Sequence, residues 1–144
     1  MTAADLFSEE QRETIRRAIE AAERRTSGEI RVHIEKQCSE DAMSCAKQRF
    51  LRLGMQRTKE RNGVLFYLAV ESRVFAIVGD EGIDQKVPAD FWNSISAMME
   101  QQFRAGKFTE GLAEGIERAG EQLEKHFPRA TDDKDELTNE ISFE

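Results

Sequence analysis

The spacing at which hydrophobic positions repeat changes along the chain, and each spacing predicts either a helix or a strand. Ser8 and Gln11 fit a capping box, and apolar residues then recur at helical spacing to about residue 25, with Gly28 as a left-handed stop. Residues 29–35 alternate instead, which indicates a strand with one buried face, either near a sheet edge or only partly covered.

The middle of the chain predicts a second helix and two further strands. Apolar positions repeat at helical spacing between Asp41 and Gly54. Residues 64–70 form a continuous apolar run, which is typical of a central strand covered on both faces. Residues 74–78 return after a short turn, so the two runs predict an antiparallel hairpin.

Two helices complete the predicted domain. Pro88 fits the first turn of a helix, and Gly106 breaks that helix. Thr109 caps the last helix, and Pro128 ends the fold. The pattern also allows a short extra strand at residues 85–87.

The order α-β-α-β-β-α-α predicts an α/β domain with a small mixed sheet of three or four strands. The crossover helix makes the first two strands parallel. The third strand runs in the opposite direction, so its carboxyl end lies beside the starts of the other two. We therefore expect the loop at Asp80 to lie near Glu29 and near Arg61-Asn62, at one rim of the sheet.

Carboxylates gather in the loop that follows the third strand. Carboxylate and carbonyl oxygens on a tight, glycine-framed turn are the ligands that a hard cation prefers. We predict one or two divalent ions at this rim, held by Asp80, Glu81, Asp84 and Asp90, with Glu29 reaching across from the first strand. A cation would also relieve the repulsion between these carboxylates and so order the loop.

The acidic loop also has a simpler interpretation. Its spacing is not that of an EF-hand. The alternative is a solvated acidic loop, in which Asp90 is only a favourable charge in the first turn of a helix.

Composition and charge fit one domain of residues 1–128 followed by an acidic tail. The 144 residues carry a net charge of −7, of which residues 129–144 hold −4 and the remaining residues −3. This balance argues against nonspecific binding to nucleic acid or to anionic membranes. The tail is polar, and we predict that it is disordered.

The sequence gives no membrane or export signal. No apolar stretch approaches the ~18 residues of a membrane helix, and the first residues lack the basic and apolar regions of a signal peptide. Cys38 and Cys45 form no metal motif, so we interpret both as free thiols of a reducing compartment. Together these features predict a cytoplasmic protein.

Candidate catalytic residues are few. His33 lies on the polar face of the first strand, where we expect a surface side chain, and His126 offers a favourable charge near a helix end. Neither Cys38 nor Cys45 has a paired histidine at helical spacing, so a nucleophilic role is not favoured. The chain contains no P-loop, dinucleotide fingerprint, G-x-S-x-G, H-E-x-x-H or Cys-x5-Arg motif. These absences weigh against a conventional enzyme.

Several blocks, in order and spacing, resemble the TPM domain family over residues 8–128. The blocks are Thr26-Ser27-Gly28-Glu29-Ile30, Arg61-Asn62-Gly63-Val64-Leu65, Val78-Gly79-Asp80-Glu81-Gly82-Ile83, Phe91-Trp92 and Phe108-Thr109-Glu110-Gly111-Leu112. The resemblance implies a three-layer α/β/α sandwich around a small mixed sheet. Many members carry a membrane anchor or an export signal, so this chain looks like a stand-alone, soluble member.

The resemblance also implies a function. Family members have been linked to divalent cations, calcium especially, through acidic loops at the sheet rim, and some plant members to acid phosphatase activity. The family's glycine-rich loop and the acid at the next helix start match Gly79-Asp80-Glu81-Gly82 and Asp90. Many members have an aspartate where this chain has Arg61, so one rim ligand is missing here or is replaced by Asn62 and backbone carbonyls.

These observations support three hypotheses. The first is a calcium- or magnesium-binding module with a metal-responsive regulatory role and an unknown protein partner. The second is a metal-dependent acid phosphatase acting on phosphomonoesters, with Arg61 and Lys86 as the phosphate-binding cations. The third is a structural interaction domain that binds no metal.

Overall fold

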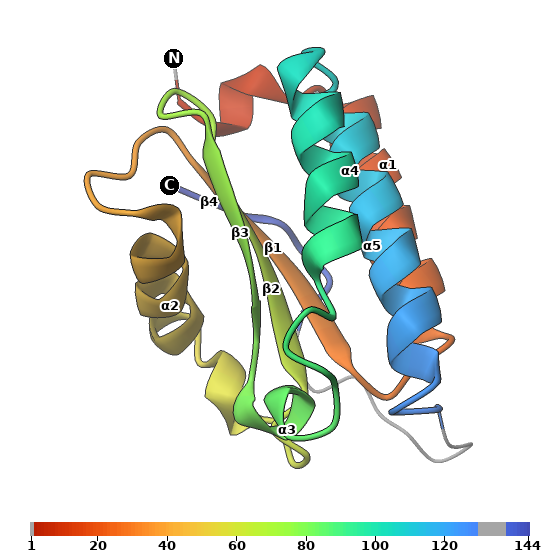
Figure 1. Cartoon of the computed structure of the whole chain (residues 1–144). Helices are drawn as coiled ribbons and strands as arrows, with labels where there is room; N and C mark the ends of the chain where they lie inside the picture. The colour runs from red at the N-terminus through yellow and green to blue at the C-terminus, as the bar shows by residue number, and fades with distance from the viewer. Residues whose placement is uncertain (1, 130–137) are drawn as a thin grey trace.

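The chain folds into three layers, with a mixed sheet between helices on both of its faces. The computed structural model describes residues 2–129 and 138–144. The described helices are α1 (Glu9–Glu23), α2 (Ala42–Arg52), α3 (Glu81–Asp84), α4 (Asn93–Arg104) and α5 (Phe108–Glu124), with 3-10 turns η1 (Ala4–Leu6) and η2 (Met55–Arg57). Helix α2 covers one face, and α1, α4 and α5 cover the other (Figure 1). The three-layer α/β/α prediction is confirmed.

In the described part of the chain, no helix is long and apolar enough to span a bilayer.

The sheet has the strand order β3-β2-β1-β4. Its strands are β1 (Glu29–Glu35), β2 (Gly63–Ala69), β3 (Val74–Gly79) and β4 (Ser142–Phe143). Strands β1 and β2 are parallel over their full length, because α2 provides the crossover, and β2 and β3 are antiparallel across their short turn. Both predicted pairings are confirmed.

The core lies on both faces of β2. Every residue of this strand is buried, as the continuous apolar run predicts. The side chains of Ile30, Val32 and Ile34 pack against α1, α4 and α5. On the other face, Leu65 and Tyr67 pack against α2.

The prediction that β1 lies near a sheet edge agrees with the strand order, since only the short β4 lies outside it, but the expectation of an exposed polar face is wrong because the strand is buried on both faces. Strand β2 pairs with one of its edges and β4 with part of the other. On the face that carries its polar side chains, Arg49 of α2 contacts Glu35 and Ser142 of β4 contacts His33, and both His33 and Glu35 are buried. The expectation of a surface His33 is therefore wrong as well.

The C-terminal residues correct two further predictions. Residues Ser142 and Phe143 form β4, which lies parallel to β1, so a tail that is disordered throughout residues 129–144 is not what the structure shows. The stretch 130–137 lies outside the described residues. The extra strand comes from here, and not from residues 85–87, where a turn follows α3.

Several chain reversals use residues other than the predicted ones. Gly28 does not have a left-handed backbone; the described glycines that do are Gly54 (φ 72°) and Gly106 (φ 78°), and the break at Gly106 is confirmed. Helix α5 is preceded by Lys107 as its N-cap, so Thr109 is already inside the helix. Pro88 lies in a turn ahead of α4.

Cys38 and Cys45 form a disulfide, so the prediction of two free thiols is wrong. Their spacing is no recognised motif, but the chain reverses at Asp41, whose side chain caps α2 by accepting the Ser44 N–H at 3.0 Å. This reversal brings the two Cα atoms to 6.2 Å. The disulfide removes the free-thiol argument for a reducing compartment, and the location of the protein stays a prediction.

Candidate functional site

The predicted rim exists at the start of β1 and β2 and the end of β3. Glu29 pairs with Gly63 in the parallel register, and the Asp80 N–H donates to the Gly63 carbonyl at 2.9 Å. Three strands therefore bring Glu29, Gly63 and Asp80 into one row across the sheet. With strands about 4.8 Å apart, the backbones of Glu29 and Asp80 lie roughly 10 Å from each other.

Arg61 binds the carboxylate on which the metal prediction depends. Its Nε and Nη2 atoms donate to the two Asp80 oxygens at 2.7 and 2.9 Å, and its Nη1 donates to Glu81 at 3.0 Å. Asp80 is only 6% exposed, so this fork of hydrogen bonds accounts for its burial as an ion. The hydrogen bonds to Asp80 also raise the pKa of Arg61.

The backbone holds Arg61 in this position. Its φ of 52° is in the left-handed region, which is unusual for a residue with a side chain. The Gly82 N–H donates to the Arg61 carbonyl at 2.9 Å. A Cβ atom at Gly82 would lie 2.2 Å from the Glu60 carbonyl oxygen, so only glycine allows α3 to approach this loop so closely.

A second polar group lies on the same rim. The Ser27 hydroxyl and the Asn62 Nδ2 both donate to Glu60 Oε2 at 3.1 Å, and Asn62 Nδ2 lies 3.3 Å from the Ser27 oxygen. Asn62 is 1% exposed. Among the described residues, no group donates a hydrogen bond to its buried Oδ1 atom. A buried amide oxygen without a donor is costly, so a turn of the Asn62 amide that gives this oxygen a partner would be favourable.

The five predicted metal ligands do not surround a single point in this conformation. Asp80 and Glu81 are bound to Arg61, whereas Asp84 and Asp90 are exposed. Glu29 is buried on the neighbouring strand. No three of them come within the 4.8 Å that joins the candidate ligand atoms of a common ion, within residues 2–129 and 138–144. Arg61 supplies the positive charge that the acidic loop requires, so the predicted set fits a cation there only after Arg61 has moved.

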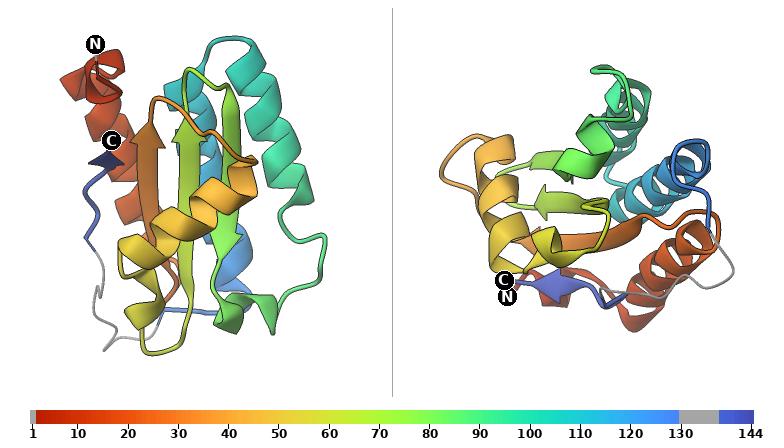
Figure 2. Two further views of the ribbon diagram at one scale, coloured as in Figure 1. Left: turned by 90° about the vertical axis from the view of Figure 1, so that its left-hand side faces the viewer. Right: turned by 90° about the horizontal axis from the view of Figure 1, so that it is seen from below.

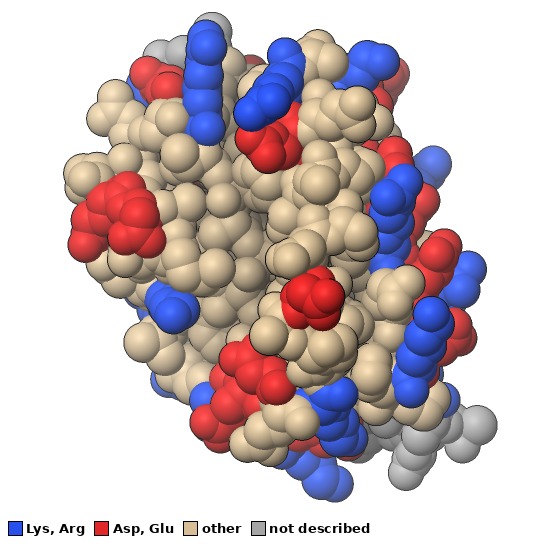
Figure 3. All heavy atoms as spheres, viewed as in Figure 1, with Lys and Arg blue, Asp and Glu red and all other residues tan. Residues whose placement is uncertain are grey.

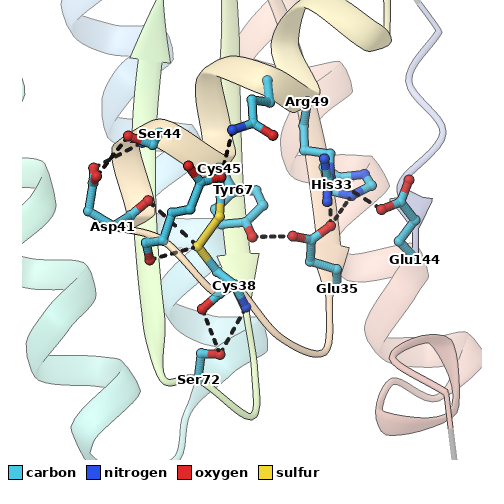
Figure 4. The surroundings of a disulfide bond; sticks show 12 residues. His33, Glu35, Cys38, Asp41, Ser44, Cys45, Arg49, Tyr67, Ser72 and Glu144 are labelled. Carbon is cyan, nitrogen blue, oxygen red and sulfur yellow. Dashed lines mark hydrogen bonds and ion pairs between the residues drawn. A yellow bond between two sulfur atoms is a disulfide. The ribbon is translucent and has the colours of Figure 1, made fainter.

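A different acidic cluster lies at the other end of β1. His33, Glu35 and Glu144 each offer a ligand atom within 4.8 Å of the others. His33 Nε2 lies 3.1 Å from Glu35 Oε1, and the Arg49 Nε lies 2.8 Å from the same oxygen (Figure 4). The Tyr67 hydroxyl donates to the second Glu35 oxygen.

The His33 cluster does not suit a metal ion. Arg49 lies between the two carboxylates, at 2.8 Å from Glu35 and 3.2 Å from Glu144, and Arg52 also binds Glu144. Both nitrogens of His33 are engaged, since its Nδ1 lies 2.7 Å from the Ser142 hydroxyl. The arginines already neutralise the carboxylates, and a cation would be repelled by them.

The electrostatics of this cluster fix its protonation. Burial lowers the pKa of His33, and the hydrogen bond to Glu35 opposes the shift only in part. Burial alone would raise the pKa of Glu35, but hydrogen bonds from Tyr67, Arg49 and His33 outweigh it and lower that pKa. Burial and the bond to Glu35 raise the pKa of Tyr67. At neutral pH the cluster is therefore a carboxylate with a neutral imidazole and a phenol.

The sequence analysis missed this cluster, although one signal was available. His33 and Glu35 are two residues apart on a strand and so share a face. Tyr67 pairs with His33 in the parallel register, and a buried tyrosine hydroxyl needs a polar partner. The predicted pairing of the two strands would have brought these three side chains together.

A hollow of about 800 Å³ lies along the outer edge of β3 (Figure 3). Strand β3 contributes Val74 and Phe75, and α4 contributes Phe103 and Arg104. Arg104 pairs with Glu100 at 2.7 Å. Arg73 and Glu100 also line the hollow, which holds none of the predicted site residues.

Comparison with known proteins gives two results for this chain. Residues 1–122 match the sequence profile of the TPM domain family. The chain is also similar to the solved NMR structure of the BA42 protein from the psychrophilic bacterium Bizionia argentinensis, with a TM-score of 0.89 and 47% sequence identity over 94% of each chain. A search of curated proteins finds no match.

Proposed function

The chain belongs to the TPM domain family, and from this premise we propose that it binds a divalent cation, calcium or magnesium, at the rim of the sheet. The observation that carries the proposal is the buried Asn62 Oδ1, for which the described residues provide no hydrogen-bond donor. A hard cation prefers oxygen ligands of this kind.

Ser27, Glu60 and Asn62 form the first part of the proposed site. Turning the Asn62 amide plane by about 180° would direct Oδ1 toward the Ser27 and Glu60 oxygens that Nδ2 now contacts. The result is a set of three oxygens, one of them charged. The Asn62 backbone is held by a hydrogen bond from its N–H to the Thr58 hydroxyl at 3.1 Å, so the amide can turn without the chain moving. Glu29, in register with the next residue, adds a second carboxylate to the rim.

Asp80, Glu81, Asp84 and Asp90 form the outer part of the proposed site. A cation that binds Asp80 must compete with the guanidinium of Arg61, which is 40% exposed and able to swing into solvent. Replacement of the Arg61 guanidinium by a cation at Asp80 would change the loop that follows β3. The domain would then have a metal-responsive element of the kind that a regulatory role requires. The number of ions, one or two, depends on whether this exchange takes place.

Thermal unfolding of the chelator-stripped protein tests the proposal. Calcium and then magnesium are titrated, because a ligand that binds only the native state raises its stability by about 2.7 kcal/mol at a hundredfold excess over Kd. We expect a saturable rise that Glu60→Gln abolishes. Glu114→Gln is the matched control, since Glu114 pairs with Arg118 on α5, away from the rim, and its rise should equal that of the unchanged protein. No rise with either ion would refute the proposal and favour the metal-free interaction domain.

Between residues 2–129 and 138–144, no contact favours the alternative of an acid phosphatase acting on phosphomonoesters. Its two candidate phosphate-binding cations both have other partners. Arg61 binds two carboxylates, and the Lys86 Nζ lies 4.4 Å from the centre of the Phe127 ring. Phosphatase activity stays an implication of the family resemblance.

A further inference from the structure

The segment that ends the chain lies along the edge of β1 that β2 does not use (Figure 2). Strand β4 pairs only with His33 and Ile34, and the Glu144 N–H donates to the Ile34 carbonyl at 2.9 Å. By contrast, β2 pairs with all of β1. The edge of β1 therefore binds an extended segment through backbone hydrogen bonds over a short stretch.

Three consecutive side chains of this segment contact specific partners. The Ser142 hydroxyl lies 2.7 Å from His33 Nδ1. The Phe143 ring lies 6.3 Å from the Phe7 ring and 5.2 Å from the Arg12 guanidinium, in a cation–π contact. The Glu144 carboxylate binds Arg49 at 3.2 Å and also Arg52. The edge thus recognises a hydroxyl, an aromatic ring and an acid in sequence.

The charges on the two sides are complementary. The chain as a whole has a net charge of −7, yet four arginines line this edge and contact the segment: Arg12, Arg16, Arg49 and Arg52. Arg16 lies 4.0 Å from Glu140, the second acid of the segment. Glutamates of the domain itself balance part of this charge, since Arg12 and Arg16 pair with Glu9, Arg16 also pairs with Glu13, and Arg49 pairs with Glu35. Four arginines against three glutamates leave a net positive charge at this edge, which favours an acidic ligand.

The segment is held less firmly than the other strands of the sheet. Ser142 and Phe143 are only partly buried, and the Glu144 side chain is 40% exposed. Two paired residues contribute little stability to a sheet, and exposed ion pairs contribute about 0–1 kcal/mol each. A competing strand with more backbone pairs could replace it, because β4 pairs with only two of the seven residues of β1.

We propose that this edge of β1 is a docking site for an extended acidic peptide of a partner protein, which carries a hydroxyl residue, an aromatic residue and an acid in consecutive positions. The peptide adds a strand to the sheet and places its acid on Arg49 and Arg52. Residues 141–144 occupy the site in the absence of the partner and act as an internal competitor. The proposal does not depend on metal binding at the rim.

A double variant of the full-length chain, Phe143→Ala with Glu144→Gln, releases the internal competitor. The probe is a fluorescent peptide with the sequence of residues 138–144, and binding is followed by fluorescence anisotropy. We expect this variant to bind the probe at least tenfold more tightly than the unchanged chain, because a tethered segment competes at an effective concentration in the mM range. A probe that carries the same two substitutions should bind at least tenfold more weakly than the parent probe.

Two further measurements locate the binding site. Arg52→Ala, added to the double variant, should weaken binding of the probe severalfold, whereas Arg118→Ala on α5 should leave it unchanged. Glu144→Lys alone is a second releasing variant that keeps the Phe143 packing, and it covers the case in which the double variant does not fold. Equal binding of both probes, or no binding by either releasing variant, would overturn the proposal. A concentration-dependent dimer of the unchanged chain, lost in both variants, would also overturn it by assigning the site to a second copy.

Discussion

At the scale of single residues, Arg61 combines an unfavourable backbone conformation with three hydrogen bonds to carboxylates. We expect Arg61→Ala to lower the stability of the metal-free protein, because Asp80 is buried and would lose its counter-charge. Arg61→Gly should be less destabilising than Arg61→Ala, because glycine adopts a φ of 52° without strain. Urea unfolding at a constant salt concentration gives the order of stability of the unchanged protein and the two variants. Equal urea midpoints for the three proteins would show that the stability does not depend on the hydrogen bonds from Arg61 to Asp80.

His33 determines how stability depends on pH at mildly acidic values. Its pKa is lowered in the folded protein, so below its ordinary value of 6.5 the unfolded chain binds more protons than the native one. The stability that this histidine contributes is therefore complete above pH 6.5 and is lost as the pH falls toward its native value. The slope for one group is at most about 1.4 kcal/mol per pH unit.

We predict that His33→Gln makes the free energy of unfolding less dependent on pH between 6.5 and 5. The measurement is urea unfolding of both proteins at several pH values in that range. Below this range, the lowered pKa of Glu35 adds a second loss of stability, which the variant keeps in part because Tyr67 and Arg49 still bind the carboxylate. An identical slope in the variant would exclude His33 as the titrating group.

Residue types alone could not show that His33 and Glu35 are buried or that Arg61 binds Asp80. The alternation of residues 29–35 predicts their shared face correctly, but a polar face is read as an exposed one unless the covering element is known. Here α2 and β4 cover it, and β4 comes from more than a hundred residues further along the chain. The Arg61 ion pairs could be anticipated only in part, because the predicted rim placed Arg61 near Asp80 without indicating that the two would bind.

At the scale of elements, patterns with a clear period were predicted well. The capping box at Ser8, the buried strand β2 and the pairing of β1, β2 and β3 all agree with the structure. Apart from the buried polar face of β1 and the strand β4, the deviations occur at the junctions, where one or two residues determine the turn. Asp41 is such a residue, since the helix start that it caps also brings Cys38 to Cys45.

The disulfide gives a testable contribution to stability at this scale. It closes a loop with a sequence separation of seven residues, for which the loss of chain entropy in the unfolded state predicts about 2–3 kcal/mol. We expect the variant Cys38→Ser with Cys45→Ser to lose this amount in urea unfolding. Dithiothreitol should destabilise the unchanged protein to a similar extent and have no effect on the variant. A response of the variant to the reductant would attribute the effect to something other than the disulfide.

At the scale of the whole molecule, the two polar clusters lie at opposite ends of one strand. The rim includes Glu29 at the start of β1. The proposed docking site, called the edge site below, pairs with His33 and Ile34 near the end of β1, beside Glu35. A strand rises about 3.3 Å per residue, so the six steps from Glu29 to Glu35 span roughly 20 Å. The strand between the ends is packed on both faces, which leaves it no obvious alternative arrangement.

We therefore predict that the rim and the edge site act independently. In a double-mutant cycle, the losses of stability caused by Glu60→Gln and Glu144→Gln should add within about 0.3–0.5 kcal/mol, as is usual for substitutions more than about 10 Å apart that share no partner. The cycle is measured by urea unfolding, with and without calcium. A larger coupling energy that appears only with calcium would mean that β1 transmits the state of the rim to the edge site, and that a cation at one end controls the segment bound at the other.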